Sequence, residues 1–515
     1  MARYSRPLSG CVAFAGGLAG AVVLALTFGA ALALILRAGG TGGFVRADWV
    51  ALRFTLFQAL LSASLSVLCA IPLARALARR DFSGRGLLIG LMGAPFILPV
   101  IVAVYGLLAI WGRSGLFSDL LAPLGLGPIH IYGLPGILLA HIFFNIPLVT
   151  RLLLQGWASI PGERFRLAAQ LGFTPWDMLK RIEWPMLRAV VPGAFLVVFL
   201  LCVTSFAIIL TLGGGPKSST IELAIYQAVR LEFDLGKAAL LALVQLAICL
   251  VAAGLSVAIS GTEDVSDSIG GPRRRWDRPS RIDPLVILLG GLFLLLPLGA
   301  VVAEGLPAIL NGLPDRVWSA LWRSVWVALG STALCGLLGL SLALLILRSR
   351  FGRLVETLGV LTLAASPFVM GTGLFLMIRP FANPLTLGLP VTALVNAAMS
   401  LPFLLRAVLP ALRQAEARHG ALAAQLGLGG LTYFRAALWP SLRTPLGFGL
   451  GLAAALAMGD LGVITLFADP NTGTLPLLMY DLMGSYRGDD AAGVALILLS
   501  SSLGLFLLFE RLGRI

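Results

Sequence analysis

The stretch AAQLG at residues 168–172 occurs a second time at residues 423–427, 255 positions further along a chain of 515 residues. Other residues recur at the same offset. They are Pro147 and Pro402, Arg151 and Arg406, Pro185 and Pro440, and Arg188 and Arg443. Because the offset is close to half the chain length, the sequence predicts two copies of one structural unit.

The composition is typical of a membrane protein that crosses the bilayer many times. Hydrophobic residues make up 58% of the chain and charged residues 12%, whereas about a quarter of a soluble domain is charged. Many apolar runs reach the length of about 20 residues that a helix needs to cross the hydrocarbon core. They lack the alternation of β-barrel strands, so we predict an all-α integral membrane protein in a lipid bilayer.

Hydropathy predicts twelve spans, six in each half of the chain. The first six are residues 11–36, 53–77, 87–111, 134–158, 189–212 and 238–260. The second six are residues 284–304, 323–347, 354–378, 388–410, 444–467 and 491–510. Since an even number of spans returns the chain to its starting side, the halves form a parallel repeat.

The predicted domains are a first half (1–260), a polar and charged linker (261–283) and a second half (284–515). When the N-terminus is placed in the cytoplasm, most of the 38 Lys and Arg residues fall in cytoplasmic loops. This distribution obeys the positive-inside rule and predicts that both termini are cytoplasmic. It also accounts for the net charge of +14, so we expect no nucleic-acid partner.

Each AAQLG lies in a long cytoplasmic loop between the fourth and fifth spans of its half, over residues 161–188 and 411–443. In both loops nine residues separate the glycine from a four-residue stretch that ends in Trp-Pro, which is IEWP at 182–185 and ALWP at 437–440. Two copies at one offset favour a function for these loops beyond joining two spans.

The sequence of the first loop predicts two helices with a glycine turn between them. Leu167, Ala168 and Leu171 are expected on one face of the first helix, and Gly172 is expected to end it in the left-handed conformation. The stretch TPWD at 174–177 then places Thr at an N-cap, Pro in the first turn and an acid three residues later. Small alanines on an exposed helix would allow another protein's groove to approach the backbone closely.

This spacing resembles the EAA loop of ABC importer permeases, in which Glu-Ala-Ala is followed by three residues, Gly, nine residues, Ile, one residue and Leu-Pro. In that family the loop helix docks into a cleft on the ATP-hydrolysing subunit. The residues expected to couple to the ATPase here are Ala168, Ala169, Gly172, Ile182, Pro185, Ala423, Ala424, Gly427 and Pro440.

The loops depart from the family pattern at three positions. The glutamate is replaced by Arg166 and Ala421, the first alanine by Leu167 and Leu422, and the leucine by Trp184 and Trp439. Glu163 and Glu416 lie upstream, and either is a candidate to substitute for the missing glutamate.

The resemblance covers nearly the whole chain, because double-length permeases form a subgroup of the family. It implies a transport subunit of the bacterial inner membrane, two copies of an ABC ATPase that bind ATP-Mg, and an external solute-binding protein. The stretch GGGPKSS at 213–219 lacks the spacing of a P-loop. The chain itself is therefore expected to hydrolyse no ATP and to bind no cofactor and no metal.

Three further segments resemble the permeases of thiamine and thiamine pyrophosphate importers. They are FILPVIVAVYGLLAIWGRSGL (96–116), GILLAHIFFNIPLVTRLLLQ (136–155) and LGGGPKSSTIELAIYQA (212–228). Iron(III) importer permeases are also fused and share the loop spacing, so iron(III) is an alternative substrate. A further alternative is an ion-coupled carrier with six plus six spans, although few titratable groups lie within the spans.

Asp460 is the clearest acid within an apolar run, and Ser205 occupies the equivalent position of the first half. Carboxylates within a membrane are costly and mark functional sites. Two roles stay open for Asp460, namely attraction of a cationic substrate and capping of a helix break near Gly459 and Gly462. Prolines expected to kink or break spans are Pro95, Pro99, Pro147, Pro367 and Pro402.

Overall fold

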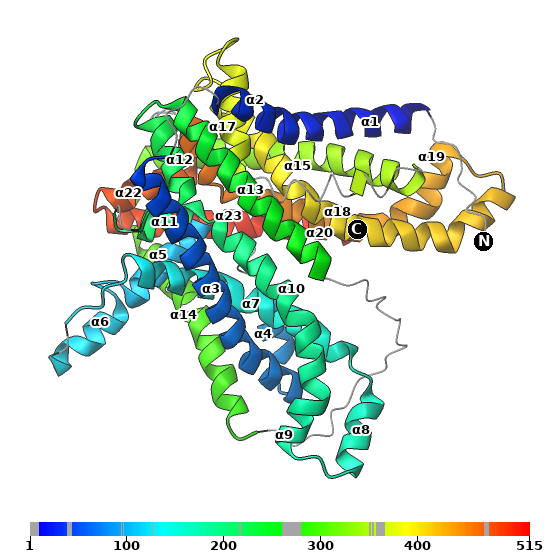
Figure 1. Cartoon of the computed structure of the whole chain (residues 1–515), viewed down its shortest axis with the longest axis horizontal. Coiled ribbons are helices and arrows are strands. Elements are labelled where there is room, and N and C mark those ends of the chain that lie inside the picture. Colours follow the sequence, from blue (N-terminus) through cyan, green and yellow to red (C-terminus); the bar gives the residue numbers. More distant parts are fainter. Residues whose placement is uncertain are drawn as a thin grey trace.

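The computed structural model describes residues 10–38, 44–93, 95, 97–125, 127–215, 218–259, 280–349, 352, 355–356, 366–467 and 473–514. All regular elements within these residues are helices, which confirms the predicted all-α class (Figure 1). Most of the predicted linker, 261–283, lies outside the described residues. The cytoplasmic placement of both termini stays a prediction.

Eleven helices in the described part of the chain are long and apolar enough to cross a membrane, and each overlaps one of the twelve predicted spans. Their bounds are Phe14–Arg37, Arg46–Arg79, Val100–Leu124, Leu134–Ser159, Pro175–Val203, Leu235–Leu255, Asp283–Leu310, Asp315–Arg348, Gly388–Gln425, Gly430–Met458 and Gly488–Arg514. The twelfth prediction, 354–378, includes the shorter helix α17 (Pro367–Ile378), and residues 357–365 lie outside the described part.

Several of these spans consist of more than one helical element. The elements of the first half are α1 (Gly10–Leu24), η1 (Ala25–Gly29), α2 (Ala30–Ala38), α3 (Arg46–Arg79), α4 (Arg85–Leu91), α5 (Val100–Trp111), α6 (Leu116–Leu121), η3 (Ala122–Leu124), α7 (Leu134–Ser159), α8 (Gly162–Gln170), α9 (Pro175–Met178), η4 (Leu179–Glu183), α10 (Trp184–Val203), α11 (Phe206–Leu212), α12 (Ile221–Arg230) and α13 (Leu235–Ile259). Those of the second half are α14 (Asp283–Leu310), α15 (Asp315–Arg348), α17, α18 (Gly388–Gln425), α19 (Gly430–Tyr433), η7 (Phe434–Leu438), α20 (Trp439–Met458), α21 (Gly462–Phe467), α22 (Leu475–Gly484) and α23 (Gly488–Arg514).

Prolines interrupt helices at some of the predicted positions and not at others. The predicted span 87–111 is divided into α4 and α5, and Pro99 is the N-cap residue of α5. Proline lacks the N–H that would continue a helix, which explains a break at this place. Helices α7 and α18 instead continue through Pro147 and Pro402, so neither proline breaks its helix, and a kink at either one stays a prediction.

Two more predicted spans, 189–212 and 444–467, are wrong as continuous helices. The first ends its helix α10 at Val203 and resumes at α11, whereas the second ends α20 at Met458 and resumes at α21. The short gaps begin at Thr204 and Gly459, which are 255 residues apart. Each half therefore interrupts the same span at the same point.

The helices form two arms that diverge from a common end of the molecule (Figure 1). One arm contains α3, α7, α10 and α14, and α8 and α9 lie at its tip. The other contains α1, α15, α18 and α20, with α19 at its tip. The two AAQLG loops therefore lie at the far ends of separate arms.

The first helix of each half packs on the opposite half. Helix α1 contacts α15, and its continuation α2 contacts α17, both from the second half. Helix α14, which begins the second half, contacts α3 and α5 of the first half. This exchange ties the halves together, and the linear repeat alone did not predict it.

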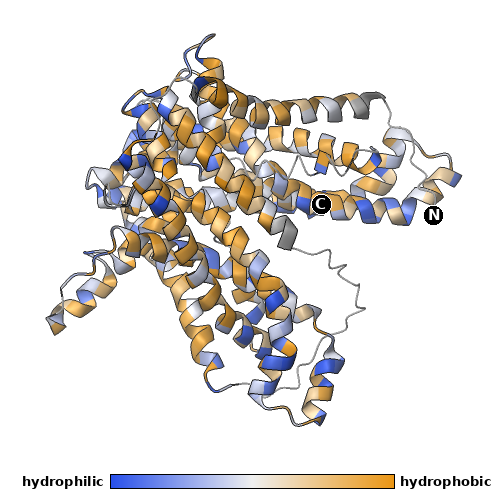
Figure 2. Ribbon diagram, in the orientation of Figure 1, coloured by the Kyte–Doolittle hydropathy of each residue, from blue (hydrophilic) through white to orange (hydrophobic). Residues whose placement is uncertain are grey.

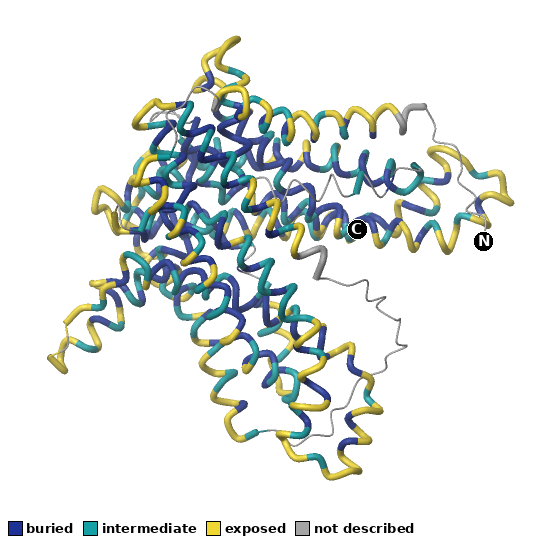
Figure 3. Tube along the Cα trace, in the orientation of Figure 1, coloured by how far each residue is buried: buried dark blue, intermediate teal, exposed yellow. Residues whose placement is uncertain are grey.

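The largest buried cluster lies where the arms meet. It includes Ile101, Leu107 and Phe143 from the first half and Met458 and Leu498 from the second. Figure 3 shows this concentration of buried residues, and Figure 2 shows hydrophobic residues continuing along both arms. In a bilayer, the exposed apolar side chains of the outer helices face lipid.

Candidate functional site

The first AAQLG loop follows the predicted local structure closely. Helix α8 ends at Gln170, and Gly172 adopts the left-handed conformation with φ 65°. The Thr174 hydroxyl accepts from the Asp177 backbone N–H at 3.2 Å, and the Asp177 carboxylate accepts from the Thr174 backbone N–H at 3.2 Å. This capping box begins α9, as predicted.

The second loop repeats this backbone at the equivalent residues. Gly427 has φ 66°, and the Leu428 N–H donates to Ala423 O at 2.9 Å. The corresponding bond in the first loop joins Phe173 N–H and Ala168 O at 3.0 Å. In both loops a five-residue π-helix, η4 or η7, then leads into the next span.

The residues of the predicted coupling set lie on two different faces. Ala168, Ile182 and Ala423 are buried within their loops. The exposed members are Ala169, Gly172, Pro185, Ala424, Gly427 and Pro440. The predicted common face of Leu167, Ala168 and Leu171 is therefore wrong, because the two leucines point outward while the alanine supports the loop from inside.

Large apolar side chains are exposed at matching positions of the two loops. In the first loop these are Leu167, Leu171 and Trp176, with exposed fractions of 56%, 63% and 68%. In the second loop Leu422, Leu426 and Leu431 occupy the equivalent positions and are also exposed. We call each set of three an apolar loop face. Large apolar groups grouped at an arm tip mark an interaction surface, and the family motif did not point to them.

A buried ion pair anchors the first loop to its arm. The carboxylate of Glu183 is fully buried and accepts from Arg75 Nε at 2.6 Å, with Arg79 Nη2 at 3.9 Å. Trp157 Nε1 donates to the same carboxylate at 3.3 Å. Sequence reasoning treated Glu183 as an ordinary loop residue, although an acid beside the motif isoleucine was the available signal.

A tyrosine anchors the second loop instead. Tyr433 is completely buried, and its hydroxyl donates to Glu416 Oε2 at 2.8 Å. The guanidinium of Arg348 lies 5.8 Å from the centre of the Tyr433 ring. Glu416 thus has a partner within its own loop, whereas Glu163 of the first loop is exposed.

The helix break of the first half carries a chain of polar side chains. Ser62 Oγ lies 2.8 Å from His141 Nδ1, and His141 Nε2 lies 2.7 Å from Ser205 Oγ. The Ser205 hydroxyl also contacts Cys202 O at 3.0 Å, in the last turn of α10. Serine and histidine therefore connect the break to α3 and α7.

The equivalent break in the second half carries a carboxylate, Asp460. Asp460 Oδ1 accepts from Gly462 N–H at 3.1 Å and caps α21, which confirms the capping role left open by the sequence. The Asp460 carboxylate also interacts with the side chain of Asn396 in α18. Asp460 and Ser205 thus belong to separate networks, the first reaching α18 and the second reaching α3 and α7.

The two breaks lie where the halves meet. The Phe206 ring, just after the first break, is 4.2 Å from the Phe368 ring of α17. A Cβ atom at Gly459, in the second break, would lie 2.9 Å from Pro99 Cα, so only glycine permits this approach. Each break therefore contacts the N-terminal end of a helix from the opposite half.

One buried acid joins the halves beside the first break. Ser366 Oγ, the N-cap group of α17, donates to Glu222 Oε1 at 2.5 Å, and Glu222 is 1% exposed. Its helix, α12, lies outside the membrane-spanning helices. Burial raises the pKa of the Glu222 carboxyl from 4.5 to about 8, partly offset by the Ser366 hydrogen bond. Sequence reasoning did not single out this residue.

Relatives match almost the whole length of the chain, although no protein-family model matches it. Thiamine transport system permease protein ThiP of Brucella abortus strain 2308 is 44% identical over 519 residues, covering 96% of this chain and 94% of the relative. The protein of the same description from Salmonella typhimurium strain LT2 is 41% identical over 537 residues, covering 99% and 98%. That from Escherichia coli strain K12 is 42% identical over 483 residues, covering 90% and 89%.

Proposed function

The chain belongs to the family of thiamine transport system permease proteins, multi-pass membrane subunits of ABC importers in the bacterial inner membrane, and we propose that it carries thiamine and its phosphates into the cell. Identity of 41–44% along nearly the entire chain carries this proposal. It favours thiamine over iron(III) as the substrate, and an ABC permease over an ion-coupled carrier.

Two copies of an ABC ATPase are proposed to dock on the loops 161–188 and 411–443. The paired apolar loop faces support this arrangement, because each presents three large side chains at the tip of an arm. Ala168 and Ala423 would hold each loop in shape, while Ala169, Gly172 and their equivalents would meet the partner. ATP-Mg would be bound by the ATPase, and this chain would hold no cofactor.

The structure offers a direct mechanical route from each loop to the centre of the molecule. Helix α10 begins directly after η4 and ends at the first break, and α20 begins after η7 and ends at the second. A displacement of either loop would therefore be carried along one helix to the place where the halves meet. Alternating access requires two such states that differ in affinity for the substrate.

Asp460 and Ser205 are proposed to lie along the substrate path between the halves. The second break supports this role, because it places the Asp460 carboxylate where the two halves meet. Thiamine carries a positive charge, and a carboxylate can stabilise such a charge in a low-dielectric environment. A solute-binding protein would deliver the substrate to the outer segments 212–237 and 467–490.

The deciding experiment is uptake of labelled thiamine by cells that lack their own thiamine importer. The chain is co-expressed with its ATPase and binding protein, and iron(III) uptake is measured in parallel. We expect thiamine accumulation that requires the ATPase. Accumulation of iron(III) alone would overturn the proposed substrate, and uptake without the ATPase would overturn the transporter class.

A second test addresses docking of the ATPase on the apolar loop faces. The double variant Leu171→Asp with Leu426→Asp places a charge in each face, so we expect loss of ATPase association by on the order of 10-fold or more. The matched control is Leu124→Asp, an exposed leucine of η3 that is 72% exposed and lies away from both loops. If the wild type, the double variant and the control all bound the ATPase equally well, docking at these faces would be contradicted.

A further inference from the structure

A cavity of about 380 Å³ lies at the end of the molecule opposite to the two loops. Tyr132, in its wall, precedes the first residue of α7, and the other end of α7 leads into the first loop. Thr211, also in the wall, lies in α11, beyond the break in that span. The volume is within the range of about 300–1,000 Å³ that small-molecule pockets occupy.

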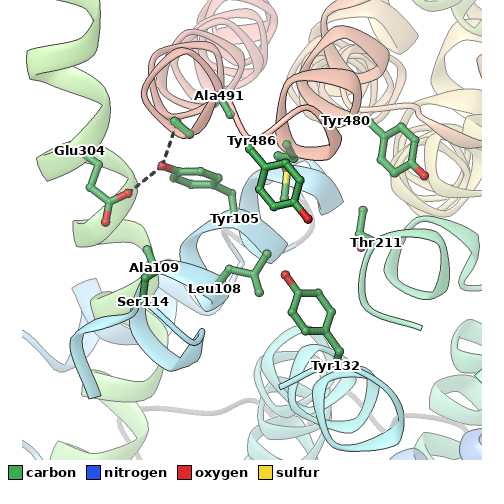
Figure 4. A pocket seen from close by; sticks show the side chains of 12 residues that line it. Tyr105, Leu108, Ala109, Ser114, Tyr132, Thr211, Glu304, Tyr480, Tyr486 and Ala491 are labelled. Carbon is green, nitrogen blue, oxygen red and sulfur yellow. Dashed lines mark hydrogen bonds between the residues drawn. The ribbon is translucent and has the colours of Figure 1, made fainter. Parts of the chain in front are cut away.

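Tyrosines dominate this cavity. Four of the seven tyrosines of the chain line it, namely Tyr105, Tyr132, Tyr480 and Tyr486. Figure 4 shows the hydroxyl ends of Tyr132 and Tyr486 facing each other across the space. Tyr105 and Tyr132 belong to the first half and the other two to the second, so motion between the halves changes the shape of the cavity.

One carboxylate faces the same space. Glu304 extends from α14, and its Oε2 atom accepts a hydrogen bond from the Tyr105 hydroxyl at 2.7 Å (Figure 4). Glu304 is exposed, although it lies in an apolar helix that spans the membrane. It lies six residues before the end of α14 at Leu310, where its carboxylate faces the cavity.

Tyr486 lines the cavity from its open side, with a side chain that is 98% exposed. Its φ of 58° is in the left-handed region, and the next residue closes the end of α22 by a bond from Arg487 N–H to Leu482 O at 3.0 Å. Glycine is favoured at this position of a helix end. Phe233, which follows helix α12 of the first half, has a φ of 54°, so this conformation recurs in both halves and by itself marks no function.

We propose that this tyrosine cavity is an outer reception site for a flat, positively charged heteroaromatic molecule. Aromatic rings attract cations over their faces and form the cages that recognise quaternary nitrogen, and Glu304 supplies the balancing charge. The inference rests on the proposed function, in which the molecule is thiamine, whose thiazolium ring carries a quaternary nitrogen. Thiamine would enter here before it reaches the breaks between the halves.

The test uses the permease–ATPase complex in lipid nanodiscs, without binding protein, and equilibrium binding of labelled thiamine. We expect Glu304→Gln to weaken binding by on the order of 10-fold. Tyr132→Leu with Tyr480→Leu should weaken it to a similar extent, while Tyr105→Phe, which keeps the ring, should have a smaller effect. Asp119→Asn is the control, because Asp119 is an exposed acid of α6 outside the cavity.

Uptake by cells then separates this inference from the proposed function. If the wild type imports thiamine and the cavity variants bind and import it equally well, the cavity is not a reception site and the proposed function stands. If the variants bind thiamine normally but import it poorly, the cavity serves another step and the inference is overturned. If the wild type imports no thiamine, the proposed function itself fails.

Discussion

The two AAQLG loops share a backbone and differ in what holds them in place. Both have a glycine near φ 65°, an equivalent backbone hydrogen bond and a π-helical turn. The first is anchored by buried Glu183 with two arginines, whereas Leu438 occupies the equivalent buried position in the second. There, Tyr433 and Glu416 form the anchor. The shape of the loop is thus shared, while the interactions that support it are not.

A related difference concerns the course of the chain into each loop. In the first half Pro161 separates α7 from α8, and the residue before it is extended. In the second half Glu416 occupies the equivalent position, and α18 continues for 38 residues through the loop helix. Proline disfavours the helical conformation in the residue before it, and Ile160 before Pro161 is extended, whereas glutamate imposes no such restriction. This one substitution explains the different connection.

Of the changes considered, replacing Glu183 with Ala is expected to reduce the stability of the folded protein most. It removes the carboxylate from beside Arg75 and Arg79, and loss of one partner of a buried ion pair costs about 3–5 kcal/mol. Thermal unfolding of the purified protein measures the loss. The control Glu163→Ala removes an exposed acid of the same loop and should cost about 0.5 kcal/mol or less. Equal effects would mean that Glu183 is no anchor.

Replacing Gly172 or Gly427 with valine should lower the stability of the folded protein by about 1–2 kcal/mol each, because a side chain disfavours the left-handed backbone conformation. A Cβ at either glycine meets no atom within 4 Å, so the cost is in the backbone and should be equal in both loops. The double variant should insert into the membrane but lose coupled uptake. Asparagine, which tolerates this conformation, is the control, and normal uptake by the valine variant would contradict a shared role.

The change Tyr433→Phe should lower stability by about 1 kcal/mol, which is less than the loss expected for Glu183→Ala or for the glycine variants. It removes one hydrogen bond to Glu416 and keeps the ring beside Arg348. The same unfolding measurement applies. If Tyr433→Phe lowered stability as much as Glu183→Ala, the two anchors would contribute equally. That result would contradict the expectation that the buried ion pair contributes more than the single hydrogen bond.

The last change, Glu222→Gln, tests a polar contact present on one side of the molecule alone, since Glu222 is the second residue of α12 and Pro476 is the second residue of α22. Its effect on stability should be smallest near pH 5, where the wild-type carboxyl is protonated and Gln replaces it by another neutral group. The pKa of Glu222 rises from 4.5 to about 8 on folding, so the folded state retains a proton that the unfolded state releases. The contribution to stability is therefore present below about pH 4.5 and is lost as the pH rises to about 8.

The measurement is the unfolding temperature of wild type and Glu222→Gln between pH 5 and 8.5. The variant carries no titrating carboxyl there, so its stability relative to the wild type should improve as the pH rises. A difference that does not change with pH would indicate that Glu222 is ionised in the folded protein. The contact with Ser366 would then need another account.

Much of the candidate site was predictable from local sequence. The left-handed Gly172 and the capping box at Thr174 depend on neighbouring residues, and both predictions are confirmed. The face of Ala168 was predicted wrongly, because an alanine fits an exposed helix or a buried contact equally well. A break near Gly459 and Gly462 was left open by the sequence, as one of two roles for Asp460, and is confirmed. The break at Ser205 in span 189–212 was missed, since hydropathy does not distinguish one long apolar helix from two short ones.

The sequence by itself determined the helical spans, the duplicated unit and the conformation of each loop, because hydrophobic runs, glycine and N-cap residues act within a few positions of the chain. Only the tertiary structure decided that α1 and α14 pack on opposite halves. It also decided that Glu183 is buried, and that Tyr105 and Tyr486 line one cavity. These features depend on contacts between residues far apart in the chain, whose partners no local pattern identifies.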